Sequence, residues 1–203
     1  YRYLKEPLRE VLRIYNPNFQ EKKEIGRTKF LPSFLKTERR IEDQKTIIIY
    51  GDTTVYEAYG SRFSIQEYSE QLKLFFAALY QHYDEFRFVY KPHPQDQQLM
   101  SELEGIPVEV YRGGLTSQLH LDEIYQEVRA CYSVASTSLL YSSFREIPSY
   151  TFYNYLGFEN EYPRVYFEND ETMKNPFLVN IVRLDQIGGI DLLQTEKETR
   201  NTS

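Results

Sequence analysis

Segments with two different hydrophobic patterns alternate along this chain. Short runs of apolar, β-branched and aromatic residues, each as long as one strand, lie at residues 46–50, 86–90, 107–111, 130–135 and 148–153. Several of the intervening segments carry apolar residues three and four positions apart, which is the spacing of a helix that buries one face. Buried strands that alternate with helices are typical of a parallel sheet covered on both sides. The pattern therefore predicts an α/β fold, a Rossmann-like doubly wound sheet of five parallel strands.

The helix after the first strand has the clearest start. Ser64 is a good N-cap, and Glu67 stands three positions later, where it completes a capping box. Apolar residues then recur on one face of this helix, at Tyr68, Leu72, Phe75, Phe76, Leu79 and Tyr83. Further helices are predicted at residues 96–103, 119–128 and 136–144, with helical pieces near residues 172–182.

The two ends of the chain lack this regular alternation. Residues 1–44 contain a stretch rich in Lys, Glu and Arg, which predicts a linker or the end of an amino-terminal domain. On this interpretation the chain is a fragment of a longer protein. Residues 45–194 form the Rossmann-like domain, and residues 195–203 form a polar, disordered tail.

Composition narrows the class of protein further. The 203 residues carry a formal net charge of −6, which argues against a nucleic-acid partner, because such a protein needs a basic face. No apolar run approaches the roughly 20 residues of a membrane span, and no signal peptide opens the chain. The single cysteine, Cys131, excludes a disulfide framework, and the three histidines are too far apart for a zinc site. We expect a soluble protein without a metal or cofactor.

The strand at residues 86–90 runs directly into Lys91-Pro92-His93-Pro94. The two prolines fix their own φ angles and keep the residues before them away from helical geometry. Ligands of open α/β sheets bind at the carboxyl ends of the strands. A cation beside an imidazole suits a phosphate leaving group there, because one neutralises charge and the other supplies a proton. The alternative is a proline-stiffened surface loop.

A second polar cluster follows a later strand. Ser136-Thr137-Ser138 come after the strand at residues 130–135 and begin a helix. The free N–H groups at a helix start, its positive dipole end and the hydroxyls together form an anion site. Simple helix capping is the alternative, since Ser and Thr are common caps. Because both clusters follow strands of one parallel sheet, we expect them to converge on one phosphate.

With these motifs, residues 45–157 resemble the carboxyl-terminal domain of bacterial sialyltransferases. The likeness is closest to the lipooligosaccharide sialyltransferases of glycosyltransferase family 52. It rests on Lys91-Pro92-His93-Pro94, the acidic stretch Leu121-Asp122-Glu123-Ile124, and Ser136-Thr137-Ser138. The resemblance implies the nucleotide-binding half of a GT-B enzyme that transfers sialic acid from CMP-sialic acid to a glycan acceptor of lipooligosaccharide or capsule. It also implies a metal-independent inverting mechanism and a homodimer, in the cytoplasm or peripherally associated with the inner face of the bacterial membrane.

The same resemblance implies roles for the residues of the nucleotide site. His93 would contact the phosphate of CMP and act as the general acid. Ser136 and Thr137 would hold the same phosphate. The remaining nucleotide-binding positions of the two motifs would be Lys91, Pro94 and Ser138.

The acidic residues are assigned less directly. In the family a carboxylate that precedes the strand at residues 86–90 is the general base, and Asp52, Glu57 and Glu67 are the candidates here. Glu67 has the alternative role of a capping-box residue. Asp122 or Glu123 would bind the ribose hydroxyls, because carboxylates accept such hydrogen bonds well, or would be solvated helix positions.

Two other functions remain open on the sequence. The first is a CDP-glycerol glycerophosphotransferase or a Kdo transferase of cell-surface polysaccharide synthesis, since these enzymes also carry a His-Pro motif. Glycerophosphotransferases usually show Asp-Tyr-Ser-Ser where this chain has Val134-Ala135-Ser136-Thr137, which favours the sialyltransferase interpretation. The second is a non-catalytic nucleotide-sugar-binding domain.

Overall fold

The computed structural model describes residues 40, 43–52, 60–93, 100–158, 162–168 and 174–189. All of them belong to one compact unit that begins at Arg39. Most of the predicted linker at residues 1–44 and all of the predicted tail at residues 195–203 lie outside the described residues. Glu57 and Pro94 also lie outside them.

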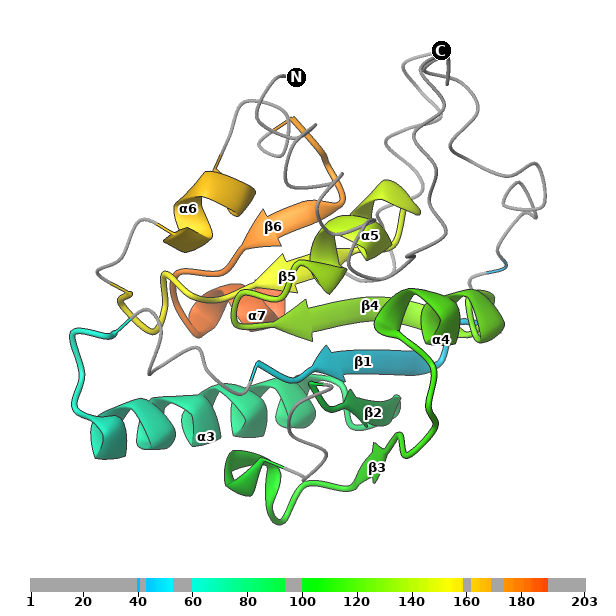
Figure 1. Cartoon of the computed structure of the whole chain (residues 1–203). Helices are drawn as coiled ribbons and strands as arrows, with labels where there is room; N and C mark the ends of the chain where they lie inside the picture. The colour runs from blue at the N-terminus through cyan, green and yellow to red at the C-terminus, as the bar shows by residue number, and fades with distance from the viewer. Residues whose placement is uncertain are drawn as a thin grey trace. The chain divides into compact units, whose positions relative to one another are not determined.

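The described strands form one parallel sheet of six strands in the order β3-β2-β1-β4-β5-β6 (Figure 1). The strands are β1 (Thr46–Tyr50), β2 (Arg87–Lys91), β3 (Val108–Val110), β4 (Val128–Ser133), β5 (Ser149–Thr151) and β6 (Leu178–Asn180). The order runs outward from β1 in both directions, so the chain returns to the centre after β3 and continues beside β1. This is the doubly wound order of Rossmann folds, which confirms the predicted fold class.

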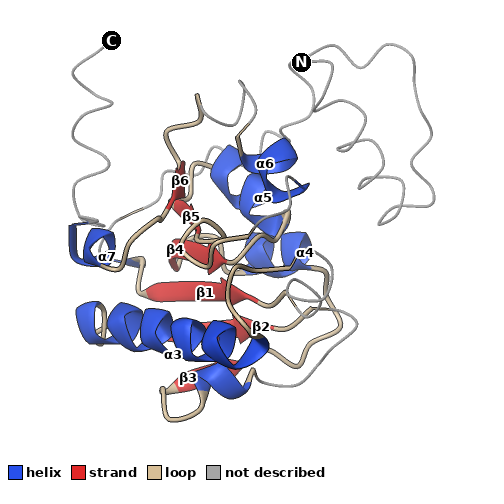
Figure 2. Ribbon diagram, turned by 90° about the vertical axis from the view of Figure 1, so that its left-hand side faces the viewer, coloured by secondary structure: helices blue, strands red, loops and turns tan. Residues whose placement is uncertain are grey.

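Helices cover both faces of the sheet (Figure 2). One face carries α3 (Ile65–His82) and α7 (Asp185–Gly189), and the other carries α4 (Ser117–Glu123), α5 (Ser138–Phe144) and α6 (Tyr162–Phe167). The predicted capping box at the start of α3 is present, because the Ser64 hydroxyl accepts the N–H of Glu67 and the Glu67 carboxylate accepts the N–H of Ser64. The short 3-10 helix η3 (Ser101–Leu103) packs beside α3.

The core lies on both sides of β1, whose five residues are all buried. On the α3 side the space is filled by aromatic rings. Phe75 stacks on Phe152 with the ring centroids 3.9 Å apart, and Phe76 meets Phe152 edge-on at 5.9 Å. Burying each of these rings contributes roughly 2–3 kcal/mol, so the central strand is fixed firmly in place. The buried character predicted for residues 46–50 is confirmed.

Two predictions of secondary structure are wrong. The helix expected at residues 119–128 ends at Glu123, and Val128 is the first residue of β4, where it pairs with Thr46. Instead of helical pieces near residues 172–182, the chain forms β6 at Leu178–Asn180, so the sheet has six strands rather than five. Both errors concern short segments whose conformation is fixed by pairing with a distant strand.

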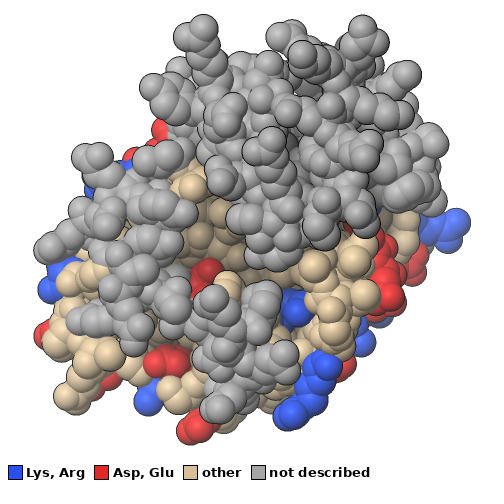
Figure 3. All heavy atoms as spheres, in the orientation of Figure 1, with Lys and Arg blue, Asp and Glu red and all other residues tan. Residues whose placement is uncertain are grey.

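Charged side chains of both signs are interspersed over the described surface visible in Figure 3. None of the described helices combines the length and the apolar character needed to cross a membrane.

Candidate functional site

The candidate site lies at the carboxyl ends of β1, β2 and β4. β1 pairs with β2 on one side and with β4 on the other, so both neighbours bring their ends to it. In Figure 1 the arrowheads of β1 and β4 point to the same side of the molecule. The strand order reverses between β1 and β4. After β1 the chain continues to β2 on one side of the sheet, and after β4 it continues to β5 on the other side. Open α/β sheets bind ligands in the crevice that forms at such a point.

Asp52 stands at this point, two residues after the end of β1. Its Oδ2 accepts hydrogen bonds from the Ser133 hydroxyl and from the backbone N–H of Ala135, the latter at 3.0 Å. The backbone N–H groups of Val134 and Ser136 also lower the pKa of this carboxyl group. The turn after β4 therefore surrounds the carboxylate with hydrogen-bond donors.

The surroundings of Asp52 change its acidity. Burial raises the pKa of the carboxyl group from 3.8 to about 6, and the hydrogen bonds from Ser133 and Ala135 oppose this rise only in part. Desolvation dominates because it penalises the charged form. A carboxyl group that titrates near neutral pH can both take up and release a proton, which suits general acid–base catalysis.

Ser133, the last residue of β4, is a site residue that the sequence analysis missed. Its Oγ lies 3.0 Å from the carbonyl oxygen of Tyr50 and accepts the N–H of Ser136 at 3.2 Å. A hydroxyl has one proton, so it donates to Asp52 when that group is ionised. When Asp52 is protonated, Ser133 can accept from it and donate to Tyr50 instead. The signal available in the sequence was a small polar residue at the end of a strand, and Ser133 is buried like the rest of β4.

Ser136 and Thr137 lie in the turn between β4 and α5, directly beside this contact, and Ser138 is the first residue of α5. The Ser136 hydroxyl accepts the N–H of Ser138 at 3.3 Å. Thr137 occupies the N-cap position of α5, yet its hydroxyl makes no capping hydrogen bond and the residue is exposed. Helix capping therefore accounts for Ser136 but gives no role to the hydroxyl of Thr137.

Lys91 is the last residue of β2 rather than the first residue of the loop, and it pairs with Tyr50 of β1. The residue is only 7% exposed, and its Nζ lies 4.9 Å from the centroid of the Tyr111 ring. No carboxylate pairs with it among the described residues. Burial lowers the pKa of the ammonium group. A buried cation without a counter-charge is unfavourable, and a bound anion would relieve this penalty.

His120 of α4 packs on the same tyrosine, and the sequence analysis gave it no role beyond excluding a zinc site. Its ring centroid lies 3.8 Å from that of Tyr111, and its buried Nδ1 has no hydrogen-bond partner within the described part of the chain. Burial, together with the charges of Lys91 and Arg87, lowers the pKa of His120 to about 4. The imidazole is therefore neutral at pH 7 and adds no charge beside Lys91.

His93 follows β2 by two residues, just as Asp52 follows β1 by two. The two strands remain paired beyond β1, because the N–H of Gly51 donates to the carbonyl oxygen of Lys91 at 2.9 Å. His93 is half-buried. The structure thus brings the predicted general acid and one of the predicted bases to the same edge of the sheet, on neighbouring segments of the chain.

Glu67 is held as a capping residue. It is exposed, and its Oε2 accepts from both the N–H and the hydroxyl of Ser64, at 2.9 and 2.8 Å. These hydrogen bonds lower the pKa of its carboxyl group, which makes it a weaker base. Of the two base candidates that the structure describes, Asp52 has the environment that a general base requires.

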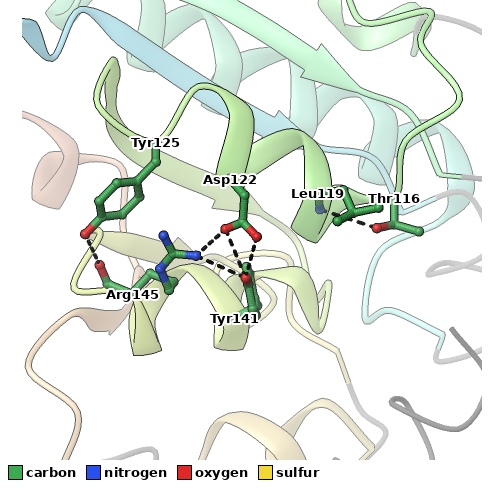
Figure 4. A network of polar contacts seen from close by, with 6 residues as sticks. All are labelled: Thr116, Leu119, Asp122, Tyr125, Tyr141 and Arg145. Carbon is green, nitrogen blue, oxygen red and sulfur yellow. Dashed lines mark hydrogen bonds and ion pairs between the residues drawn. The ribbon is translucent and has the colours of Figure 1, made fainter. Parts of the chain in front are cut away.

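Asp122 contributes to the packing of α4 on α5 (Figure 4). Its carboxylate forms an ion pair with Arg145 and accepts a hydrogen bond from the Tyr141 hydroxyl at 3.0 Å. Arg145 is the C-cap of α5 and is separated by three residues from the start of β5, so this pair lies toward the amino ends of the strands. Glu123, at the end of α4, is exposed. No described contact links either carboxylate to Asp52.

Within the described part of the chain, no group of three or more His, Cys, Asp and Glu side chains is arranged to hold a metal ion. Among the described residues, the carboxyl ends of β1, β2 and β4 instead carry the Asp52 carboxylate, the Lys91 ammonium group, the His93 imidazole and several hydroxyls. Such a set can bind an anion and move a proton.

No protein-family model matches the chain, and no curated protein is similar to it in sequence. Among solved structures, the S. aureus MnaA–UDP co-structure is similar in part, with 12% sequence identity and a TM-score of 0.38. The similarity covers 74% of this chain and 46% of that chain, so this chain spans less than half of that protein's length. A similarity at this level does not identify a function.

Proposed function

We propose that this chain is the nucleotide-sugar-binding half of a glycosyltransferase that transfers sialic acid from CMP-sialic acid to a glycan acceptor. The observation that carries the proposal is the meeting of three polar segments where the strand order reverses. Asp52 follows β1, Lys91 ends β2 and His93 follows it, and Ser133 leads from β4 into the hydroxyl-rich turn. The motifs that resemble family 52 sialyltransferases supply the choice of sugar.

The phosphate of the donor would bind between the end of β2 and the turn after β4. Lys91 offers a positive charge that no described carboxylate neutralises. Thr137 offers a hydroxyl that is not used for capping, and Ser136 offers a second one. Hydrogen bonds to a charged group are worth about 1.5–3 kcal/mol each, so these contacts are sufficient to select a phosphate over a neutral ligand.

The reaction is a single displacement. The acceptor hydroxyl gives its proton to Asp52, and its oxygen forms a bond to the anomeric carbon of sialic acid. The bond from that carbon to the phosphate oxygen breaks, and its electron pair stays on the phosphate. His93 donates a proton to that oxygen, and Lys91 balances the remaining charge. Attack from the face opposite the leaving group inverts the configuration at the anomeric carbon.

Calorimetric titration of the purified chain with CMP, UMP and CDP-glycerol tests this proposal. We expect CMP to bind and UMP to bind more weakly, with CDP-glycerol no tighter than CMP. Preferential binding of CDP-glycerol would favour the glycerophosphotransferase alternative. Binding of CMP without transfer, even in the full-length protein supplied with donor and acceptor, would favour a non-catalytic domain. The absence of binding to any of the three would contradict the proposal.

A further inference from the structure

A second pocket lies beyond β5 and β6 and shares no residue with the site around Asp52. Its volume is about 490 Å³, which is within the usual range for small-ligand sites. Its lining comes from the segment before α3, from α3 itself, from the segments after β5 and β6 and from the start of α7. The polar and aromatic lining residues are Arg62, Phe63, Gln71, Tyr155, Arg183 and Asp185. The segments before α3, after β5 and after β6 lie on the side to which the strand arrowheads point in Figure 1. These segments therefore lie at the same edge of the sheet as the proposed nucleotide site.

Hydrogen bonds fix the wall of the pocket between α3 and β5. The N–H of Arg62 donates to the carbonyl oxygen of Gly157 at 3.0 Å, and the Ser61 hydroxyl donates to that of Leu156 at 2.6 Å. The Tyr155 hydroxyl donates to Gln71 Oε1 at 2.7 Å. The segment before α3 is thus tied to the segment after β5, and no described residue accepts a hydrogen bond from the carboxamide N–H₂ of Gln71.

The opposite wall is also fixed. The side-chain oxygen of Gln186 accepts the N–H groups of Val182 and Arg183 at 2.7 and 2.8 Å, which closes the turn before α7. Arg183 forms an ion pair with Asp185 at 3.1 Å. The pocket is therefore preformed on both sides, which lowers the ordering cost of binding.

Arg62 gives the pocket an excess of positive charge. Its guanidinium group lies over the Phe63 ring at 4.8 Å, and no carboxylate pairs with it among the described residues. Gly157 makes room for it, because a side chain at position 157 would overlap the Arg62 side chain. Since Asp185 neutralises Arg183, Arg62 carries the net charge. A planar guanidinium group matches the geometry of a carboxylate, to which it can donate two parallel hydrogen bonds.

The rest of the lining suits a sugar ring. The Phe63 and Tyr155 rings offer apolar surface, whereas the Gln71 amide and the Asp185 carboxylate can bond hydroxyl groups. We propose that this pocket binds a carboxylate-bearing sugar and that Arg62 holds the carboxylate. The proposal rests on the proposed function, in which such a sugar comes either from the donor or from the end of the acceptor glycan.

Calorimetric titration of the chain with N-acetylneuraminic acid tests the proposal, and its methyl ester is the matched ligand without the charge. We expect the acid to bind at least about 10-fold more tightly than the ester, the smallest difference typical of a charge-assisted pair. Arg62→Gln should weaken binding of the acid by about 10- to 100-fold and leave binding of the ester unchanged. Arg62→Lys, which keeps the charge but loses the planar fork, should fall between the two.

The matched control is Arg164→Gln, which removes another exposed arginine from α6, outside the pocket. It should change neither affinity, and thermal melting should show that both glutamine variants are folded. Competition with a non-hydrolysable CMP-sialic acid analogue distinguishes the two sources, since a donor subsite would be blocked and an acceptor subsite would stay open. Equal binding of acid and ester, an unchanged Arg62→Gln variant, or no binding of the acid would overturn the proposal. If the chain bound the acid but did not bind CMP, the proposed function would be overturned and the proposal for this pocket would stand.

Discussion

At the scale of single residues, burial of the Asp52 carboxyl group disfavours its charged form. Its pKa is about 6 in the folded protein and 3.8 as an ordinary carboxyl group, so the folded state binds this proton more tightly than the unfolded chain. The free energy of unfolding therefore falls as the pH rises from about 4 to beyond 6. In the proposed mechanism, the raised pKa that suits Asp52 to act as a general base also lowers the stability of the folded protein at neutral pH.

Asp52→Asn removes this charge while keeping the size of the side chain. We expect the variant to exceed the wild type in free energy of unfolding by up to about 3 kcal/mol at pH 8, because two pKa units correspond to roughly that difference. The advantage should vanish near pH 4, where the wild-type group is protonated. Urea denaturation at both pH values measures it, with the exposed Asp84→Asn as control. An advantage that does not change with pH would contradict the assigned pKa.

His93→Ala tests the general acid. We expect turnover in the full-length enzyme to fall by roughly 10²–10⁴-fold, the usual contribution of general acid catalysis. The affinity for CMP should change much less, because the proton matters most as charge develops on the leaving group. Steady-state kinetics and calorimetry give the two quantities, and His82→Ala on the exposed end of α3 is the control. A variant that keeps its turnover and pH profile would show that His93 is an ordinary loop residue.

At the scale of elements, the turn between β4 and α5 is the proposed phosphate-binding segment. Changing Ser136 and Thr137 together to Ala should weaken CMP binding by about 1–3 kcal/mol, since hydrogen bonds to a charged group are lost. Stability should fall by only about 1 kcal/mol, the value of a lost helix cap. Calorimetry and urea denaturation of the double variant test this. The opposite outcome, a stability loss with unchanged CMP affinity, would mean that these two residues only stabilise the start of α5.

The packing of α4 on α5 gives a contrasting prediction. Asp122→Ala leaves the Arg145 side chain, which is 4% exposed, without its ion-pair partner, so the protein should lose roughly 2–4 kcal/mol of stability. CMP affinity, measured at a temperature where the variant is folded, should stay the same. Glu123→Ala, its exposed neighbour, should alter neither quantity. A selective loss of CMP affinity would instead support the ribose-binding role that the family resemblance implies.

The elements differ in how far the sequence alone predicts them. Helix α3 is predictable because its capping box and its apolar face are local features. The three-residue strand β6 is not, because its conformation depends on pairing with β5. At the site, Lys91, His93 and the hydroxyl-rich turn stand out as motifs. The contact of Asp52 with Ser133 cannot be predicted from a motif, because it joins residues 81 positions apart and depends on the register of β4 beside β1.

At the scale of the whole molecule, the order of the strands decides where chemistry can occur. β1 and β4 are neighbours in the sheet although two strands separate them in the sequence. Asp52 lies at their carboxyl ends, and the segments after β5 and β6, which line the second pocket, lie at the same edge. A donor nucleotide and an acidic sugar could therefore approach each other across one edge of the sheet.

The same arrangement predicts that catalysis needs no metal. The leaving group of a CMP-sugar is CMP, which carries a single phosphate. Lys91 and His93 can balance the charge of this phosphate without a divalent cation. Turnover of the full-length enzyme should therefore be unchanged after dialysis against EDTA. Activity that is lost in EDTA and restored by Mn²⁺ would contradict this mechanism.

The most direct test of the central claim is a crystal structure of the chain soaked with CMP. The account predicts the phosphate at the carboxyl ends of β2 and β4, within hydrogen-bond distance of the hydroxyls of Ser136 and Thr137 and close to Lys91 and His93. A nucleotide bound at any other edge or face of the sheet, with this site empty, would contradict the account.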